Sequence, residues 1–524
     1  MRRRAIILLC LLAVLLIPSC SEYIPFLEEK AGSFASVSQR DGIICISENN
    51  GDGRGRPVTL TAAFNGDGDR EYSYQWFVCS DESKNDGMKI DGATERTYTT
   101  GYLDEIGKVY YYYCEITGKE GLVKKTKETK VFYVCCTGLP TLIIDTENNA
   151  EIVNKTDKIP ATIRYVSATQ DLELASTVKG RGNASWDYFP KRSYTIKLDK
   201  KTAFGSLPKS KKWVLVSNYN DKTLLRNWYA SFMDNTVLDN DSNWNPSYLH
   251  VDCILNGEYI GNYTLVEQIR IDDNRLNLPD ISKQADPADG GFILEVNWRM
   301  DEAYNFISDH GVTFSLKDPD LEDMEASQAQ AVFSYIKALV NNAEAVLYSD
   351  DYVQFASCFD IPSFVDWYIV NEIAKTWDGR FRTSVYMYYD PADSLIHMGP
   401  DWDYDDSWGG SDTYDRLSTD GFYLNDCAWY AHLFKCPDFV SALKDRWNDR
   451  KAAIIDSVNH LQAMSETLAV SANLNFKKWD ILGTRVFTSA PGYEKRKTYQ
   501  SEIDFMKNWI LERIEWLDPA INGL

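Results

Sequence analysis

The sequence predicts a multidomain protein in which an all-β N-terminal sandwich precedes a large α+β domain with its strands early and its helices late. Residues 41–138 alternate apolar and polar side chains in short runs that Gly, Asn and Asp separate, as in strands joined by turns. Beyond about residue 300, apolar residues recur at three- and four-residue intervals, as in helices. A chain of 524 residues that is 44% hydrophobic is long enough for several packed domains.

The first twenty residues are typical of an export signal. Three arginines precede an apolar run of 13 residues, 5–17, which is too short to span a bilayer but suits a signal peptide. The run ends just before Cys20 and resembles a bacterial lipoprotein signal, in which that cysteine receives lipid. We therefore expect residues 1–19 to be a signal peptide and 20–40 to be a lipid anchor and linker. The mature protein would be exported and membrane-anchored to the cell envelope, in the periplasm or at the surface.

Charge and cysteine usage exclude two classes of function. Acids outnumber bases 77 to 55, so most of the surface would repel a phosphate backbone, and no nucleic-acid partner is expected. Once Cys10 leaves with the signal and Cys20 takes the lipid, nine cysteines remain. Their spacing fits neither a zinc site nor a dense disulfide framework.

Residues 41–138 resemble an immunoglobulin-like sandwich. The expected strands include 72–78, which carries Trp76, and 109–117. Tyr112, two residues before Cys114, matches the tyrosine corner of such domains. The strand expected around 58–64 holds no cysteine, so we expect Trp76 to pack on apolar neighbours rather than on a disulfide between the sheets.

The second domain is expected to cover residues 139–520. Strands are predicted at 139–145, 161–166 and 290–296. Helices are predicted at 328–347, 361–373 and 498–517, because apolar residues there follow the helical period.

A basic island lies early in this domain. Residues 179–226 contain twelve Lys and Arg against three acids. Its centre, Lys179-Gly-Arg-Gly-Asn183, is a Gly-containing turn after a predicted strand, and such turns let backbone N–H groups approach an anion. Taken in isolation, the segment is more simply explained as a hairpin with a solvated basic face.

An acidic island lies later. Residues 390–426 contain ten Asp, with Arg416 as their counter-charge. In an extended segment Asp401, Asp403 and Asp405 would point to one side, and carboxylates that close need a cation. Ligands that are all oxygen favour Mg²⁺, Mn²⁺ or Ca²⁺. The alternative is an acidic surface loop, against which the neighbouring tryptophans argue.

A further carboxylate precedes the acidic island. Asp378 follows the predicted helix at 361–375, and a strand at 384–389 separates it from Asp403. Phosphoryl transfer uses this layout, in which one carboxylate accepts the hydroxyl proton and another holds the metal.

Several motifs, in order, are similar to those of the CotH kinase family of atypical kinases. They are RGNASW at 181–186, PKRSYTIKLD at 190–199, FGSLPKSKKWVLVSNYNDKTLLRN at 204–227, LNGEYIGNYTLVEQI at 255–269, GGFILEV at 290–296 and MGPDWDYDDSWG at 398–409. The resemblance implies a protein-kinase-like fold that binds ATP with Mg²⁺ or Mn²⁺ and phosphorylates protein Ser or Thr.

The resemblance also implies roles for individual residues. Asp378 would be the catalytic base and Asp403 the metal ligand, with Asp405 as a helper. Ser384 would take the metal-holding position at which many members have Asn, and a hydroxyl is a weaker ligand. The nucleotide contacts would come from Arg181, Lys197 with Lys191 as the alternative, and Glu267, which would orient a lysine or line the adenine pocket.

Two other functions remain open. ATP is scarce outside the cytoplasm, which favours a catalytically inactive surface module for binding or adhesion. Paired carboxylates beside aromatic residues also suit a carbohydrate-active enzyme. Metal-dependent nucleotide binding separates the kinase from the module, and the activity lost in Asp378→Ala separates it from the hydrolase. The sequence does not name the protein substrate.

Overall fold

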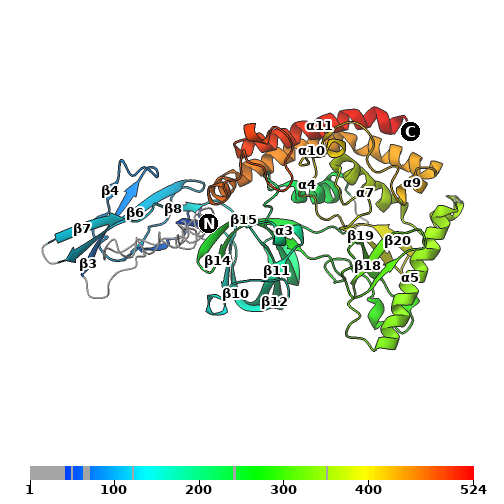
Figure 1. Ribbon diagram of the computed structural model, residues 1–524, viewed down its shortest axis with the longest axis horizontal. Helices are drawn as coiled ribbons and strands as arrows, with labels where there is room; N and C mark the ends of the chain where they lie inside the picture. The colour runs from blue at the N-terminus through cyan, green and yellow to red at the C-terminus, as the bar shows by residue number, and fades with distance from the viewer. Residues whose placement is uncertain (1–41, 49–50, 63–70, 121–122, 240–243, 350–351) are drawn as a thin grey trace, which may run out of the picture. The chain divides into compact units, whose positions relative to one another are not determined.

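The computed structural model describes residues 42–48, 51–62, 71–120, 123–239, 244–349 and 352–524 (Figure 1). The predicted signal peptide, Cys20 and the linker lie outside these residues. The chain divides into two compact units, Met1–Cys136 and Thr137–Leu524. In the ranges given above, no helix is long and apolar enough to cross a bilayer.

The N-terminal unit is all β. One sheet has the order β1-β8-β6-β3-β4, with β7 paired to β6, and β2 pairs with β5 in a second sheet. The strands are β1 (Ile43–Ile46), β2 (Thr59–Thr61), β3 (Tyr72–Cys79), β4 (Met88–Lys89), β5 (Thr97–Thr99), β6 (Val109–Glu120), β7 (Val123–Glu128) and β8 (Phe132–Cys136).

Trp76 lies at the centre of this unit's core. Its ring is fully buried and lies 5.9 Å from that of Tyr98 and 5.5 Å from that of Phe132. Cys114 is its register partner on β6 and is not in a disulfide. The apolar packing predicted for Trp76 is therefore confirmed. The tyrosine corner predicted at Tyr112 differs in the structure. The hydroxyl that accepts a hydrogen bond from upstream backbone is that of Tyr110, and the donor is Glu105 N–H at 3.3 Å.

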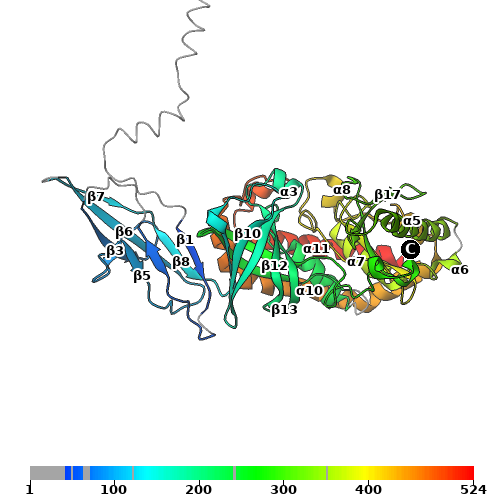
Figure 2. The same cartoon turned by 90° about the horizontal axis from the view of Figure 1, so that it is seen from below.

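The second unit begins with a closed seven-stranded barrel (Figure 2). Its order is β9 (Thr141–Thr146), β10 (Ile159–Val166), β11 (Asp171–Arg181), β12 (Ser193–Phe204), β13 (Leu207–Val216), β15 (Glu258–Glu267) and β14 (Tyr248–Leu255). Alternating side chains of these strands, among them Ile163, Trp213 and Leu265, fill the barrel. The barrel closes where β14 pairs in parallel with β9.

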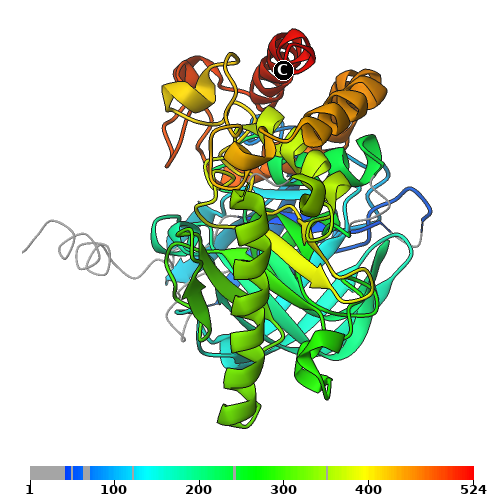
Figure 3. The ribbon, with the colours of Figure 1, turned by 90° about the vertical axis from the view of Figure 1, so that its right-hand side faces the viewer.

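A five-stranded sheet follows. Its order is β17 (Asn305–Ile307), β18 (Thr313–Asp318), β16 (Phe292–Val296), β19 (Val385–Asp390) and β20 (Leu395–Met398). Helix α5 (Ala326–Tyr348) lies across it, with the ring of Phe333 5.8 Å from that of Phe306 (Figure 3). Most strands precede the long helices, as predicted, but β19 and β20 lie between helices in the chain.

Four more helices complete the core. They are α4 (Arg226–Phe232), α7 (Ile361–Ala374), α10 (Pro437–Lys478) and α11 (Tyr499–Asn522). Helix α7 is buried on nearly every side, whereas α10 and α11 run side by side along the outside (Figure 1). The remaining short helices are η1 (Glu147–Asn149), α3 (Ala184–Asp187), η2 (Met233–Val237), η3 (Ile281–Lys283), η4 (Pro287–Asp289), α6 (Tyr352–Phe355), α8 (Tyr414–Leu417), α9 (Tyr430–Leu433) and η5 (Tyr493–Lys495).

Candidate functional site

The acidic loop, residues 399–410, leaves strand β20 and carries Asp403 at its centre. Asp403 has a left-handed backbone with φ of 71°, and Ser384, which faces it, has φ of 57°. The Ser384 hydroxyl lies 3.4 Å from the Asp403 carboxylate. Such conformations cost about 1–3 kcal/mol in residues with a side chain, and they cluster at functional sites. The loop therefore holds Asp403 and Ser384 against a local backbone preference.

Four carboxylates, Asp378, Asp403, Asp405 and Asp406, interact electrostatically in this region. Desolvation, with the nearby charge of Asp406, raises the pKa of Asp403 to about 6, although the side chain still reaches solvent. Desolvation and then the charge of Asp403 also raise the pKa of Asp378 and of Asp405. These carboxylates therefore share an electrostatic environment that carries more negative charge than its surroundings compensate.

Two arginines partly offset this charge. The Arg181 guanidinium lies 5.4 Å from the ring centre of Trp402, and its charge opposes the rise in the pKa of Asp403. Arg299 similarly opposes the rise in the pKa of Asp378, and it donates to the Thr383 hydroxyl at 2.9 Å. Arg181 comes from the barrel and Arg299 from the loop after β16, so two layers of the unit meet at the carboxylates.

Asp401 does not join the cluster. Its carboxylate accepts hydrogen bonds from the Asn371 amide (3.2 Å) and the Tyr404 hydroxyl (2.5 Å), and burial raises its pKa to about 7. The expected convergence of Asp401 with Asp403 and Asp405 is therefore wrong. The segment is not an extended strand, because the left-handed turn at Asp403 breaks the alternation of side chains.

Neighbouring elements hold the acidic loop by its backbone. The Asn227 side chain accepts from Tyr404 N–H at 2.7 Å, and Arg226 Nε donates to the Ser407 carbonyl at 2.8 Å. Arg226 also forms a buried ion pair with Asp221. The motif at 218–227 thus holds the acidic loop in place. Arg226 and Asn227 fix the position of Asp403 through their hydrogen bonds to the loop backbone.

Glu295 belongs to the site, although the sequence analysis did not select it. One of its oxygens accepts from Ser384 N–H at 3.1 Å, and the other pairs with Lys317 Nζ at 3.0 Å. One feature of the sequence could have indicated this residue, namely an acidic side chain inside the otherwise apolar strand FILEV. A buried strand rarely holds a charged residue unless the charge has a partner.

The predicted lysines lie elsewhere. Lys191 is 1% exposed and donates to the Asn262 carbonyl (2.5 Å) and the Asn475 side chain (2.8 Å). Burial lowers its pKa to about 7. The structure thus argues against Lys191 as a phosphate contact, because it ties the barrel to α10. Lys197 is exposed on β12, opposite Lys212 on β13.

Glu267 does not orient a lysine. It ends β15, is 1% exposed and pairs with Arg275 at 3.6 Å, while its other oxygen accepts from Ser247 N–H at 3.1 Å. The expected lysine partner is therefore an arginine. The residue that follows, Gln268, faces a pocket that is described below.

A model of the CotH kinase protein family matches residues 178–517. The chain belongs to this family. No curated protein matches the chain. Membership implies a kinase-like phosphotransferase and, in general, the use of a nucleotide and a divalent metal.

The CotH site offers few protein ligands for a metal. Among the residues that the structure describes, no group of three or more His, Cys, Asp or Glu side chains is placed to hold a metal ion. Mg²⁺ is commonly held by one or two carboxylates, with water and substrate phosphates completing its shell. Asp403, with the Ser384 hydroxyl, fits that mode, and the excess negative charge around Asp403 favours a cation.

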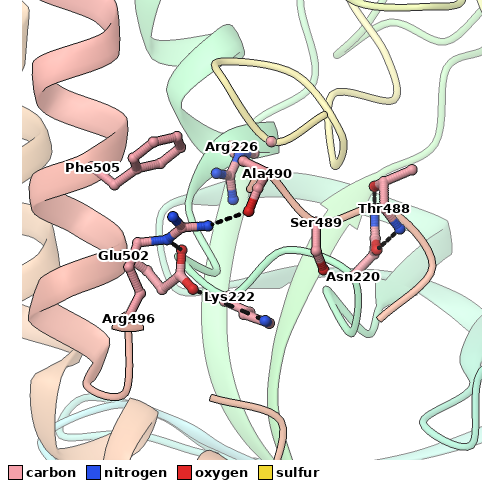
Figure 4. Close-up of a pocket in the computed structure, with 10 residues that line it drawn as sticks. Asn220, Lys222, Arg226, Thr488, Ser489, Ala490, Arg496, Glu502 and Phe505 are labelled. Atoms are coloured by element: carbon pink, nitrogen blue, oxygen red, sulfur yellow. Dashed lines mark hydrogen bonds and ion pairs between the residues drawn. The ribbon is translucent and has the colours of Figure 1, made fainter. Parts of the chain in front are cut away.

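Two pockets in the CotH unit differ in size. One, of about 190 Å³, lies between the barrel and β18 and is lined by Lys212, Arg270 and Lys317 among others. The other lies beside Arg226, where Arg496 pairs with Glu502 (Figure 4). Its volume of about 20 Å³ admits one water molecule, which is too little for a nucleotide.

Proposed function

We propose that the protein transfers the terminal phosphate of ATP to Ser or Thr of a protein, with Mg²⁺ or Mn²⁺ as cofactor. The observation that carries the proposal is the contact of Asp403 with Ser384 (3.4 Å), at a point where the charge of Asp403 acts on Asp378 and Asp405 and is opposed by Arg181. Uncompensated carboxylates are costly to keep together without a cation, and basic groups beside them suit phosphates.

We assign a separate role in phosphate transfer to each of these residues. Asp403 and Ser384, with Asp405 as helper, would hold the metal, which supplies charge neutralisation at the phosphates. Asp378 would accept the proton of the acceptor hydroxyl, and its raised pKa suits a general base. The Arg299 charge opposes this rise and favours the ionised form of Asp378. Arg181 would face the phosphates.

We propose that the adenine and ribose of the nucleotide bind in the 190 Å³ pocket. It lies beside Gln268, just after the last barrel strand, and its wall includes Lys317. Lys317 contacts Glu295, Glu295 contacts the Ser384 backbone, and the Ser384 hydroxyl lies beside Asp403. A nucleotide whose base enters this pocket would therefore extend its phosphates toward the carboxylates.

Calorimetric titration of ATP into residues 137–524 tests the proposal. The titrations use Mg²⁺, Mn²⁺ or chelator, with Asp403→Ala and the exposed control Asp415→Asn. We expect metal-dependent binding that Asp403→Ala loses and Asp415→Asn keeps. Absence of binding under every metal condition would refute the kinase reading.

One observation favours an inactive member of the family as the second candidate. Ser384 offers a hydroxyl where many members have Asn, and a hydroxyl binds Mg²⁺ more weakly. Nucleotide binding without phosphate transfer to any protein, combined with transfer in Ser384→Asn, would identify a kinase-like module whose turnover was lost at this position.

We further propose that the protein is exported and lipid-anchored through Cys20, and that the immunoglobulin-like N-terminal unit acts as a spacer. The basis is the charged and apolar order of residues 1–20 and the two sheets around Trp76. Labelling with a fatty-acid analogue should mark the wild-type protein and not Cys20→Ser. Equal labelling of both would contradict the anchor.

A further inference from the structure

We propose that Trp298, Arg299, Trp377 and Arg382 form an acceptor surface that binds acidic polypeptide segments next to the base Asp378. The inference rests on the proposed function, because it names the class of protein substrate for the same site. It selects acceptors in which Asp or Glu flanks the Ser or Thr that receives the phosphate.

Backbone contacts fix this surface to the base. Arg382 N–H donates to the Asp378 carbonyl at 3.1 Å, and Trp298 N–H donates to the Arg382 carbonyl at 2.9 Å. The loop after β16 and the segment after α7 are thereby joined at Asp378. Trp377 and Arg382 therefore lie within four residues of Asp378 in the sequence. Trp298 and Arg299 belong to the loop that is hydrogen-bonded to this segment.

Each tryptophan of the surface lies against an arginine. The Arg382 guanidinium stacks 4.2 Å from the ring centre of Trp377, and that of Arg299 lies 5.5 Å from the ring centre of Trp298. The two rings remain 38% and 58% exposed, respectively. Exposed tryptophans are rare on a surface without a partner, because burial of such rings is strongly favourable. One terminal nitrogen of each guanidinium is already engaged, since Arg299 Nη1 donates to the Thr383 hydroxyl at 2.9 Å and Arg382 Nη1 to the Trp377 carbonyl at 3.5 Å, so a partner would bind the other N–H groups.

The charges of the surface point to an anionic partner. In the described ranges, neither Arg299 nor Arg382 forms an ion pair with a carboxylate. By contrast, their neighbour Arg380 pairs with Asp426 at 3.0 Å. Arg299 nevertheless interacts with the charges of Asp378 and Asp301, so Arg382 supplies most of the positive charge that the surface offers to a partner. A planar guanidinium matches the two oxygens of a carboxylate.

A polypeptide fits better than another polyanion. Two arginine–tryptophan pairs offer separate sites for acidic side chains on both sides of a hydroxyl, and the exposed ring faces can cover the apolar part of a peptide chain. An anionic polysaccharide is the competing partner, and the experiment includes it.

The test uses residues 137–524 with Mg²⁺ and a non-hydrolysable ATP analogue. Three fluorescent peptides share one Ser and differ in flanking residues, which are Asp, Ala or Lys, and binding is read by anisotropy. We expect the Asp peptide to bind about tenfold more tightly than the Ala peptide, and this gain to shrink as salt rises. Arg382→Gln should lose most of the gain with unchanged nucleotide binding, whereas Arg485→Gln, an exposed arginine paired with Asp412, should keep it.

A charge reversal makes the test independent of folding defects. Arg382→Glu should weaken binding of the Asp peptide and strengthen binding of the Lys peptide, which a misfolded variant would not do. Equal binding of the three wild-type peptides, or tighter binding of polygalacturonate than of the Asp peptide, would overturn the inference. If the Asp peptide binds selectively but receives no phosphate when ATP is supplied, the acceptor surface stands and the proposed kinase activity fails.

Discussion

Replacement of Asp403 by Asn should stabilise the ligand-free protein while removing its metal-dependent nucleotide binding. The pKa of Asp403 rises from 3.8 to about 6 because desolvation and Asp406 disfavour its charge. A shift of about two units corresponds to at most about 3 kcal/mol at pH values above 6. Because the Asp403 side chain reaches solvent, screening reduces this cost, and we expect about 1 kcal/mol.

The sign of the effect depends on pH. The folded-state pKa is raised, so ionisation of Asp403 at neutral pH costs folding free energy, whereas well below the ordinary pKa of 3.8 the carboxyl is protonated in both states and the cost vanishes. Asp403→Asn should therefore be more stable than wild type at pH 7.5, and the difference should disappear as the pH falls below 3.8. Saturating Mg²⁺ should narrow the difference at pH 7.5, because the cation stabilises the wild-type carboxylate.

Scanning calorimetry of residues 137–524 measures the effect. For a unit of this size, 1 kcal/mol corresponds to a shift in Tm of about 1 °C. Asp415→Asn, which removes an exposed carboxylate from the same acidic island, is the matched control and should leave Tm unchanged. A lower Tm for Asp403→Asn at pH 7.5 would refute the reasoning, since it would mean that the carboxylate is stabilised where it lies.

Two further predictions concern the frame around the site. Gly409→Ala should cost well over 1 kcal/mol in thermal or denaturant unfolding, because its φ is 76° and a Cβ would lie 2.7 Å from the Trp509 ring, whereas Gly421→Ala, with φ of 81° and open space, should cost only about 1 kcal/mol. Equal losses would show that the contact with Trp509 does not limit the loop. Burial lowers the pKa of Lys191 to about 7, so between pH 7 and 10 this lysine is neutral in the folded protein and still protonated in the unfolded chain. The free energy of unfolding of the wild type, relative to that of Lys191→Met, should therefore increase over this pH range. A constant difference across that range would contradict the lowered pKa.

Local elements of the fold follow closely from the sequence. The predicted helix at 361–373 is α7 (Ile361–Ala374), because Asp360 accepts from Ser363 N–H as an N-cap and a proline stands in the first turn. The predicted strand at 109–117 is part of β6 (Val109–Glu120), which begins with an uninterrupted run of β-branched and aromatic residues, VYYYY. Closure of the barrel was not predicted, because it depends on pairing between β9 and β14, more than a hundred residues apart.

The candidate site was predicted only in part. Ser384 contacts Asp403, and the charge of Asp403 raises the pKa of Asp378 and of Asp405. Glu295 was missed because only the fold brings β16 beside Ser384. Contrary to the prediction from the sequence, Asp401 does not point toward Asp403, because its carboxylate accepts hydrogen bonds from the buried side chains of Asn371 and Tyr404.

The sequence by itself determined the family, the order of the elements and the two charge islands, since motifs, periodicity and charge runs are properties of neighbouring residues. Tertiary structure decided which charges meet. Lys191, Lys197 and Arg181 share one basic island, yet the first is buried against α10, the second is exposed on β12, and only the third lies beside the carboxylates. The physical reason is that desolvation and Coulomb interactions depend on distances through space, which strand pairing and helix packing set and residue spacing along the chain does not.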